Sequence, residues 1–149
     1  MVSLGVEIRQ AKIEDLPRIY EIEVLSFKDP YPYHYLKALY HLSPIFLVAT
    51  LNSEVAGYII ALLRWKNIGH IISLAVHPSY RRKGIGKLLL NRTLVILKSL
   101  GATSCRLEVR EDNIPAQLLY CSLGFSESHR VKGYYRDGAT AIVMVKELR

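Results

Sequence analysis

The feature that most constrains this chain is a glycine-rich, cationic turn, Arg-Arg-Lys-Gly-Ile-Gly at residues 81–86. The apolar segment before it, residues 71–76, reads as a strand, and the segment after it, residues 85–100, has apolar side chains at helical spacing. Such a turn at a helix N-terminus offers backbone N–H groups to an anion, and the helix dipole favours the negative charge. Glycine allows a phosphate to approach the backbone closely. The turn therefore predicts a ligand that carries phosphate groups.

Two common phosphate-binding motifs do not fit this turn. A Walker A loop needs a glycine five positions before its Gly-Lys pair and Ser or Thr after it, but Arg81 and Leu88 stand there. A dinucleotide-binding fingerprint needs a third glycine where the chain has Leu89. The pattern Arg-x-x-Gly-x-Gly remains, with a purely structural helix start as the alternative.

A second segment, residues 107–125, reads LEVREDNIPAQLLYCSLGF: a strand, an Asn, a short helix with a Tyr, and Gly-Phe. Together with the 81–86 turn, it closely resembles the cofactor-binding segments of the GNAT superfamily of N-acetyltransferases. It is most similar to the protein N-terminal acetyltransferases, especially the ribosomal-protein alanine acetyltransferase branch. Residues 8–16 resemble the first strand and helix of that fold, so the resemblance covers nearly the whole chain in the expected order.

Half of the residues are hydrophobic and no linker or low-complexity stretch is present, so we expect one domain spanning residues 1–149. Strands are predicted at 6–10, 45–51, 55–63, 70–76, 105–110, 125–132 and 139–146. Helices are predicted at 13–25, 33–42, 85–100 and between 113 and 124. The expected class is α/β (α+β). The resemblance implies the GNAT fold, with a central, mostly antiparallel mixed sheet of about seven strands flanked by about four helices.

Composition narrows the possible partners. No apolar run approaches the roughly 20 residues of a membrane span, and no secretory signal is evident, so we expect a cytoplasmic protein without a membrane partner. Cys105 and Cys121 read as free thiols, and the five histidines lack zinc-binding spacing, so no metal is expected. The net charge of +7 is compatible with nucleic acid, an acidic surface or an anionic ligand. No nucleic-acid recognition motif is present, and a polyphosphate ligand already explains the basic cluster at 81–87.

The resemblance identifies this ligand as acetyl-CoA, the cosubstrate. Backbone N–H groups of residues 82–87 are expected to hold its pyrophosphate, with Arg81 and Lys83 adding charge. The resemblance also implies that the main chain of residues 74–76 pairs with the pantetheine arm, where an N–H near Val76 would polarise the thioester carbonyl. The expected cofactor-binding residues are Leu74, Ala75, Val76, Arg81, Arg82, Lys83, Gly84, Ile85, Gly86, Lys87, Asn113 and Tyr120.

Acetyl transfer to an amine also needs a base, and Glu108 is the candidate. It lies in an apolar strand between Leu107 and Val109, so strand alternation turns its side chain opposite to theirs. An ordinary solvated glutamate, or a partner for a neighbouring Arg, is the alternative interpretation. The resemblance favours a base that acts directly or through a water molecule.

Tyr120 matches the tyrosine that protonates the leaving sulfur in this family, since a phenol can donate to a moderately basic thiolate. A buried tyrosine packed on the sheet is the alternative, in a chain with ten tyrosines. Asn113 suits both a helix N-cap and a contact with the cofactor.

For the acceptor, related enzymes use the loop between the first two helices and the last hairpin loop. The corresponding residues here are Phe27, Tyr31, Tyr33, Tyr134 and Tyr135. Tyrosines suit a channel that binds peptide backbone while tolerating varied side chains, although each could equally be a surface or core residue. Glu23 is a further candidate, which could read the first substrate residue or its amine.

The predicted function is therefore acetyl-CoA-dependent acetylation of protein N-terminal α-amines, with ribosomal proteins as one candidate substrate class, by a monomer or weak dimer. An α-amine has a pKa near 8, whereas a lysine at about 10.4 needs roughly 3 kcal/mol more for deprotonation. The alternatives are a GNAT enzyme acting on a small amine or a lysine side chain, and a non-catalytic acyl-CoA-binding module. The presence of Glu108 and Tyr120 argues against the last of these.

Overall fold

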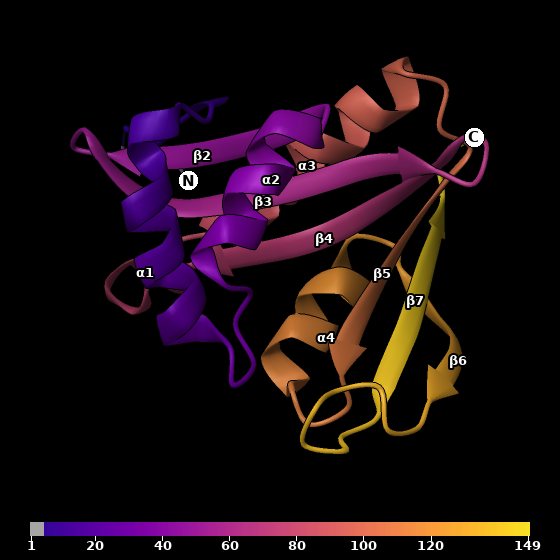
Figure 1. The fold of residues 1–149 in the computed structure, drawn as a ribbon. Helices are drawn as coiled ribbons and strands as arrows, with labels where there is room; N and C mark the ends of the chain where they lie inside the picture. Colours follow the sequence, from indigo (N-terminus) through magenta and orange to yellow (C-terminus); the bar gives the residue numbers. More distant parts are fainter. Residues whose placement is uncertain (1–4) are drawn as a thin grey trace. The chain divides into compact units, whose positions relative to one another are not determined.

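The computed structural model describes residues 5–149 and contains, over that range, seven strands and four α-helices (Figure 1). The strands are β1 (Glu7–Gln10), β2 (Ile45–Leu51), β3 (Glu54–Arg64), β4 (Ile68–Val76), β5 (Ser104–Arg110), β6 (Ser126–Val131) and β7 (Ala141–Glu147). The α-helices are α1 (Leu16–Ser26), α2 (Tyr33–Leu42), α3 (Ile85–Ser99) and α4 (Ile114–Ser122). Two short 3-10 helices are η1 (Ile13–Asp15) and η2 (Pro78–Tyr80).

Hydrogen bonds order the strands β1-β2-β3-β4-β5-β7-β6. The pairs β1–β2, β2–β3, β5–β7 and β6–β7 are antiparallel, whereas β4 and β5 run parallel from the Ile68–Ser104 pair to the His70–Arg106 pair. The predicted class, a mostly antiparallel mixed sheet with four helices, is confirmed. Only element ends differ: η1 precedes α1, and β7 begins at Ala141 instead of residue 139.

The described chain divides into two units, one of residues 5–62 and 72–93 and the other of residues 63–71 and 94–149. The chain passes between the units inside β3, β4 and α3. The single domain expected from the sequence stays a prediction. Among the described residues, no helix combines the length and the apolar character needed to cross a bilayer.

In the first unit, α1 and α2 lie against the sheet strands β2 and β3 (Figure 1). Helix α1 is amphipathic: Leu16, Ile19 and Ile22 are fully buried at helical spacing. They form one apolar cluster with Leu36 of α2 and with Tyr58, which lies on the same side of β3. This packing positions α1 and the segment that follows it.

In the second unit, β5 alternates between a buried and a less buried face. Leu107 and Val109 are buried, so Glu108 lies on the opposite side of the strand, as predicted. Helix α4 follows β5 and begins at an N-cap, where the Asn113 side chain accepts a hydrogen bond from the Ala116 N–H at 3.2 Å. The strand and the cap together position the predicted catalytic residues of this unit.

Candidate active site

The first unit contains the cationic turn. Its backbone adopts left-handed conformations at Arg82 (φ 64°) and Gly84 (φ 79°), and α3 begins at Ile85. The first intrahelical bond of this end joins the Leu88 N–H to the Gly84 carbonyl at 3.1 Å. The N–H groups of a first helical turn have no carbonyl within the helix to bind, so they are available to an anion. Ile85 is buried, which leaves its main chain rather than its side chain for a ligand.

Arg81 has a second role besides its charge. Its Nε donates to the Val76 carbonyl at 2.9 Å, and its Nη2 donates to Ser26 Oγ at 3.2 Å. The guanidinium therefore ties the turn to the last residue of β4 and to the end of α1. From the sequence, Arg81 was predicted only to add charge for the ligand, and these contacts show that it also shapes the turn.

The end of β4 lies very close to β3. A Cβ atom at Gly57 would approach the Ala75 carbonyl oxygen to 2.9 Å and Val76 Cγ2 to 3.3 Å. Glycine is therefore required for β3 to lie this close to the predicted cofactor strand. The register of β4 with β5 ends at His70, so Leu74, Ala75 and Val76 come after the last such pair.

The predicted acceptor residues of the first unit lie beside α1 and α2. Phe27 and Tyr31 pack against the apolar cluster. The Tyr31 ring contacts that of Tyr35 at a centroid distance of 4.8 Å, and the Tyr33 ring meets that of Tyr20 edge-on at 5.8 Å. These tyrosines form an aromatic surface between the two helices.

Glu23 does not face this surface. It is only 2% exposed and accepts hydrogen bonds from the Tyr58 hydroxyl, from Ser73 Oγ at 3.0 Å and from the Tyr31 N–H at 3.0 Å. Burial raises its pKa, although these donors partly offset the effect. The idea that Glu23 reads the substrate amine is therefore wrong, because its carboxylate is enclosed by the protein's own donors.

In the second unit, Glu108 is hydrogen-bonded to two side chains, an imidazole and a guanidinium. Its Oε1 lies 2.7 Å from His70 Nε2, and its Oε2 accepts from Arg106 Nε at 2.8 Å. Burial alone raises the pKa of Glu108, but the hydrogen bonds from His70 and Arg106 outweigh it, so the net pKa lies below the usual value. The carboxylate is ionised at neutral pH and can only accept, which makes Nε2 of His70 the donor.

His70 was missed by the sequence analysis, which considered histidines only as zinc ligands. It is 8% exposed, and among the described residues its Nδ1 has no hydrogen-bond partner. The Trp65 ring contacts the His70 ring in a tilted arrangement at a centroid distance of 5.2 Å, and Arg106 lies over the Trp65 ring at 5.3 Å. A histidine inside an apolar strand was the signal that could have revealed it.

Tyr120 is buried, 8% exposed, and its ring packs edge-on against Phe125 at 6.0 Å. Burial raises its pKa to about 12. The phenol therefore keeps its proton at neutral pH and acts as a hydrogen-bond donor. The alternative interpretation, a buried tyrosine packed in the core, fits this environment, and the assignment of Tyr120 to the leaving sulfur stays a prediction.

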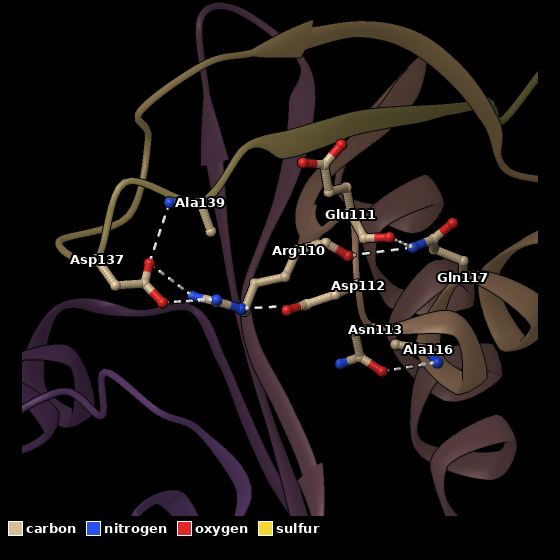
Figure 2. Close-up of polar contacts among 8 residues, drawn as sticks. All are labelled: Arg110, Glu111, Asp112, Asn113, Ala116, Gln117, Asp137 and Ala139. Atoms are coloured by element: carbon tan, nitrogen blue, oxygen red, sulfur yellow. Dashed lines mark hydrogen bonds and ion pairs between the residues drawn. The ribbon is translucent and has the colours of Figure 1, made fainter.

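The segment between β6 and β7 carries the remaining acceptor candidates and is tied to the end of β5 (Figure 2). Arg110 donates to both carboxylate oxygens of Asp137, at 3.2 and 2.7 Å, and to Asp112 at 3.2 Å. Its guanidinium also lies 5.0 Å from the ring of Tyr135, which contacts Tyr134 at a centroid distance of 5.0 Å. Bidentate pairing gives this connection a defined geometry.

Gln117 of α4 also binds the end of β5. Its Nε2 donates to the Arg110 carbonyl at 3.1 Å and to the Glu111 carbonyl at 3.0 Å (Figure 2). Together with the Asn113 cap, these bonds join the first turns of α4 to the end of β5. The start of α4, and with it the course of the helix toward Tyr120, is therefore set by side-chain bonds to the backbone.

Residues 16–125 match the model of the acetyltransferase (GNAT) family. The chain belongs to this family. It is 36% identical over 154 residues to an N-alpha-acetyltransferase of Saccharolobus solfataricus, covering 95% of this chain and 92% of that one. It is 31% identical over 140 residues to the ribosomal protein bS18-alanine N-acetyltransferase of Escherichia coli K12, covering 92% and 94%.

Among solved structures, Ard1 from Thermoplasma volcanium is similar with a TM-score of 0.93 and 28% identity, covering 96% of this chain and 97% of that one. The family resemblance and the GNAT fold expected from the sequence are therefore confirmed. Family membership makes this protein an N-acetyltransferase.

Proposed function

We propose that this protein transfers the acetyl group of acetyl-CoA to the N-terminal α-amine of protein substrates, by direct attack within a ternary complex. The observation that carries the proposal is the similarity, over 95% of the chain, to an N-alpha-acetyltransferase. The side chains described above supply a base and a donor for that chemistry. Ribosomal proteins are a candidate substrate class because a second relative acts on ribosomal protein bS18.

The turn before α3 is assigned to the pyrophosphate of acetyl-CoA. The N–H groups of residues 82–87 bind it, and Arg81, Lys83 and Lys87 add positive charge. The main chain of Leu74, Ala75 and Val76 is assigned to the pantetheine arm. Asn113 is a further contact to the cofactor, in addition to its role as N-cap.

The base is assigned to the Glu108–His70 pair. As the new N–C bond forms, the amine loses a proton, which passes to this pair directly or through a water molecule. Glu108 orients the imidazole by accepting a hydrogen bond from its Nε2. Deprotonating the substrate amine does not require a strong base, because an α-amine with a pKa near 8 is partly neutral at pH 7.

Tyr120 is assigned to the leaving sulfur. When the C–S bond breaks, the electron pair goes to the CoA thiolate, and the Tyr120 hydroxyl stabilises it by a hydrogen bond. A phenol whose pKa is about 12 does not transfer its proton fully to a thiolate of ordinary basicity, near 8.5. Tyr120 therefore acts as a donor in the transition state.

The peptide is assigned to the tyrosine-bearing segments. In the first unit these are Phe27, Tyr31 and Tyr33. In the second unit they are Tyr134 and Tyr135, which are tied to β5 through Arg110. The tyrosine hydroxyls bind peptide backbone, which places few demands on the side chains of the substrate.

Acetyl-CoA turnover on a peptide panel tests the proposal. The panel contains peptides that begin with Ala, Ser, Met-Leu and Met-Glu, one with the N-terminus of ribosomal protein bS18, and an N-blocked lysine peptide. We expect acetylation of at least one free α-amine and none of the blocked peptide. Transfer to the blocked lysine peptide alone would contradict the assignment, and tight acetyl-CoA binding without turnover would favour a non-catalytic binding module.

A further inference from the structure

Glu23 carries a carboxylate at a buried position, where charged side chains are rare. It lies on the buried side of α1 beside Ile19 and Ile22, which are fully buried. A carboxylate removed from water is costly unless several donors compensate it. An apolar side chain at this position would extend the buried apolar face of α1 without needing any hydrogen-bond donor. A carboxylate at the same position needs several donors.

Three segments supply the donors. Oε1 of Glu23 accepts from the Tyr58 hydroxyl of β3 and from Ser73 Oγ of β4, and these two hydroxyls lie 3.1 Å apart. Oε2 accepts the N–H of Tyr31, in the segment between α1 and α2. One carboxylate oxygen of Glu23 is therefore hydrogen-bonded to strands of the sheet, and the other is hydrogen-bonded to the connecting segment.

The connecting segment, residues 27–32, ends in Asp29-Pro30-Tyr31-Pro32, and neither of its two prolines has a backbone N–H. The Tyr31 N–H is therefore the one backbone donor between two residues that have none, and it points at Glu23 at 3.0 Å. The Tyr31 ring lies on the aromatic surface with Tyr35.

We propose that Glu23 is a positioning residue for the acceptor peptide, acting through the backbone of Tyr31. This inference rests on the proposed function, which assigns Phe27, Tyr31 and Tyr33 to the peptide. Through Ser73, the same carboxylate also contacts the strand whose next residues, Leu74 to Val76, are assigned to the pantetheine. Within the first unit, Glu23 thus links the segment assigned to the acceptor to β4, the strand assigned to the cofactor.

The variant Glu23→Gln tests this role because it keeps the shape and replaces one oxygen by an NH2 group. If the amide oxygen accepts from the two hydroxyls, its NH2 group faces the Tyr31 N–H, which cannot accept. If the oxygen turns to Tyr31 instead, the NH2 group can donate to the hydroxyls, but the acceptor of the Tyr31 N–H is then no longer charged. We expect the KM for a substrate peptide to rise about tenfold or more, since a hydrogen bond to a charged group is lost. The KM for acetyl-CoA should stay within about twofold of wild type.

Two further variants separate positioning from general stability. Glu21→Gln is the matched control: Glu21 lies two residues earlier on α1, is exposed and pairs with Arg18 at the surface. It should change neither KM. Tyr58→Phe removes one hydroxyl donor and leaves the Tyr31 contact intact, so it should lower the melting temperature without a matching rise in the peptide KM.

Hydrogen exchange of the wild-type protein tests the contact without any variant. The Tyr31 amide should exchange at least about tenfold more slowly than in an unfolded peptide, and faster in Glu23→Gln. An unprotected Tyr31 amide in the wild type would overturn the inference, even if the variant failed to fold. So would a peptide KM in Glu23→Gln equal to that of Glu21→Gln. Absence of any peptide turnover by the wild type would instead remove the proposed function.

Discussion

Two glutamates of this chain show how strongly a carboxylate depends on its surroundings. Glu108 is hydrogen-bonded to an imidazole and a guanidinium, which bring its pKa below the usual value against the effect of burial. Glu23 is hydrogen-bonded to two hydroxyls and an amide, and burial prevails, so its pKa is raised. The first stays ionised and suits proton acceptance in concert with His70. The second serves to hold its donors in place.

At this scale we expect Glu108→Gln to lower kcat/KM for a peptide by about 10²- to 10³-fold near pH 7. The loss should be smaller near pH 9, where more of the amine is already neutral. Initial rates between pH 6 and pH 9 measure this profile. Glu111→Gln is the control, since Glu111 is an exposed neighbour paired with Arg130. Equal rates for the wild type and Glu108→Gln across this range would remove Glu108 from the chemistry.

The same variant has a defined effect on stability. The folded-state pKa of Glu108 is lowered, so the wild-type carboxylate contributes stability that is present above its unfolded pKa, about 4.3. This contribution is lost as the pH falls through the folded-state pKa. The difference in unfolding free energy between wild type and Glu108→Gln should therefore shrink in acid, as urea unfolding at pH 7 and pH 3.5 can measure.

At the scale of elements, glycines decide how closely strands and helices approach. Gly57 allows β3 to lie against the Ala75 carbonyl of β4, and Gly69 allows β4 to accept the side chain of Leu97 from α3. The first contact is with backbone, which cannot move without shifting the strand. The second is with a buried leucine, which cannot rotate freely. The position of β4, the strand assigned to the cofactor, thus depends on a residue in its neighbour β3.

We expect Gly57→Ala to lower the unfolding free energy by about 1–3 kcal/mol, because β3 and β4 must separate. It should also raise the KM for acetyl-CoA several-fold, since Ala75 and Val76 shift with the strand. Gly69→Ala is the matched control: it introduces the same methyl group against Leu97, at 2.6 Å, and should destabilise the protein without changing this KM. Equal effects of both variants on the KM would contradict the role given to β4. Urea unfolding and steady-state kinetics measure the two quantities.

At the scale of the whole molecule, the order of strands and helices is that of an acetyltransferase, and the similarity extends over nearly the full chain. The boundaries between the two units fall inside β3, β4 and α3. A chain that crosses between its parts in this way is expected to unfold in one cooperative step. Ligand binding should then stabilise the whole molecule.

We expect acetyl-CoA at 100 times its Kd to stabilise the folded protein by about 2.7 kcal/mol, which raises the melting temperature by roughly 5–10 °C in a single transition. Acetyl-pantetheine, which lacks the pyrophosphate, should give a much smaller shift at the same concentration. Calorimetry or a dye-based melt measures both. Equal shifts for the two ligands would contradict the assignment of the 81–86 turn to the pyrophosphate.

Features that arise from neighbouring residues were predictable from the sequence alone. Alternation placed Glu108 opposite Leu107 and Val109, and Asn113 was identified as an N-cap. The glycine-rich turn and the helix after it were also predicted, because a turn, a cap and an amphipathic helix are set by interactions within a few positions. The order and type of nearly all elements followed from such signals.

The partners of the functional side chains depended on tertiary structure. His70 meets Glu108 across 38 positions of sequence, Arg110 meets Asp137 across 27, and Glu23 reaches Tyr58 across 35. Such pairs exist only once strand register and helix packing bring distant residues together, and no local pattern encodes that distance. The sequence by itself therefore determined the family, the elements and the candidate chemistry. Only the tertiary structure decided which groups hold each candidate catalytic side chain, and that Glu23 faces the interior.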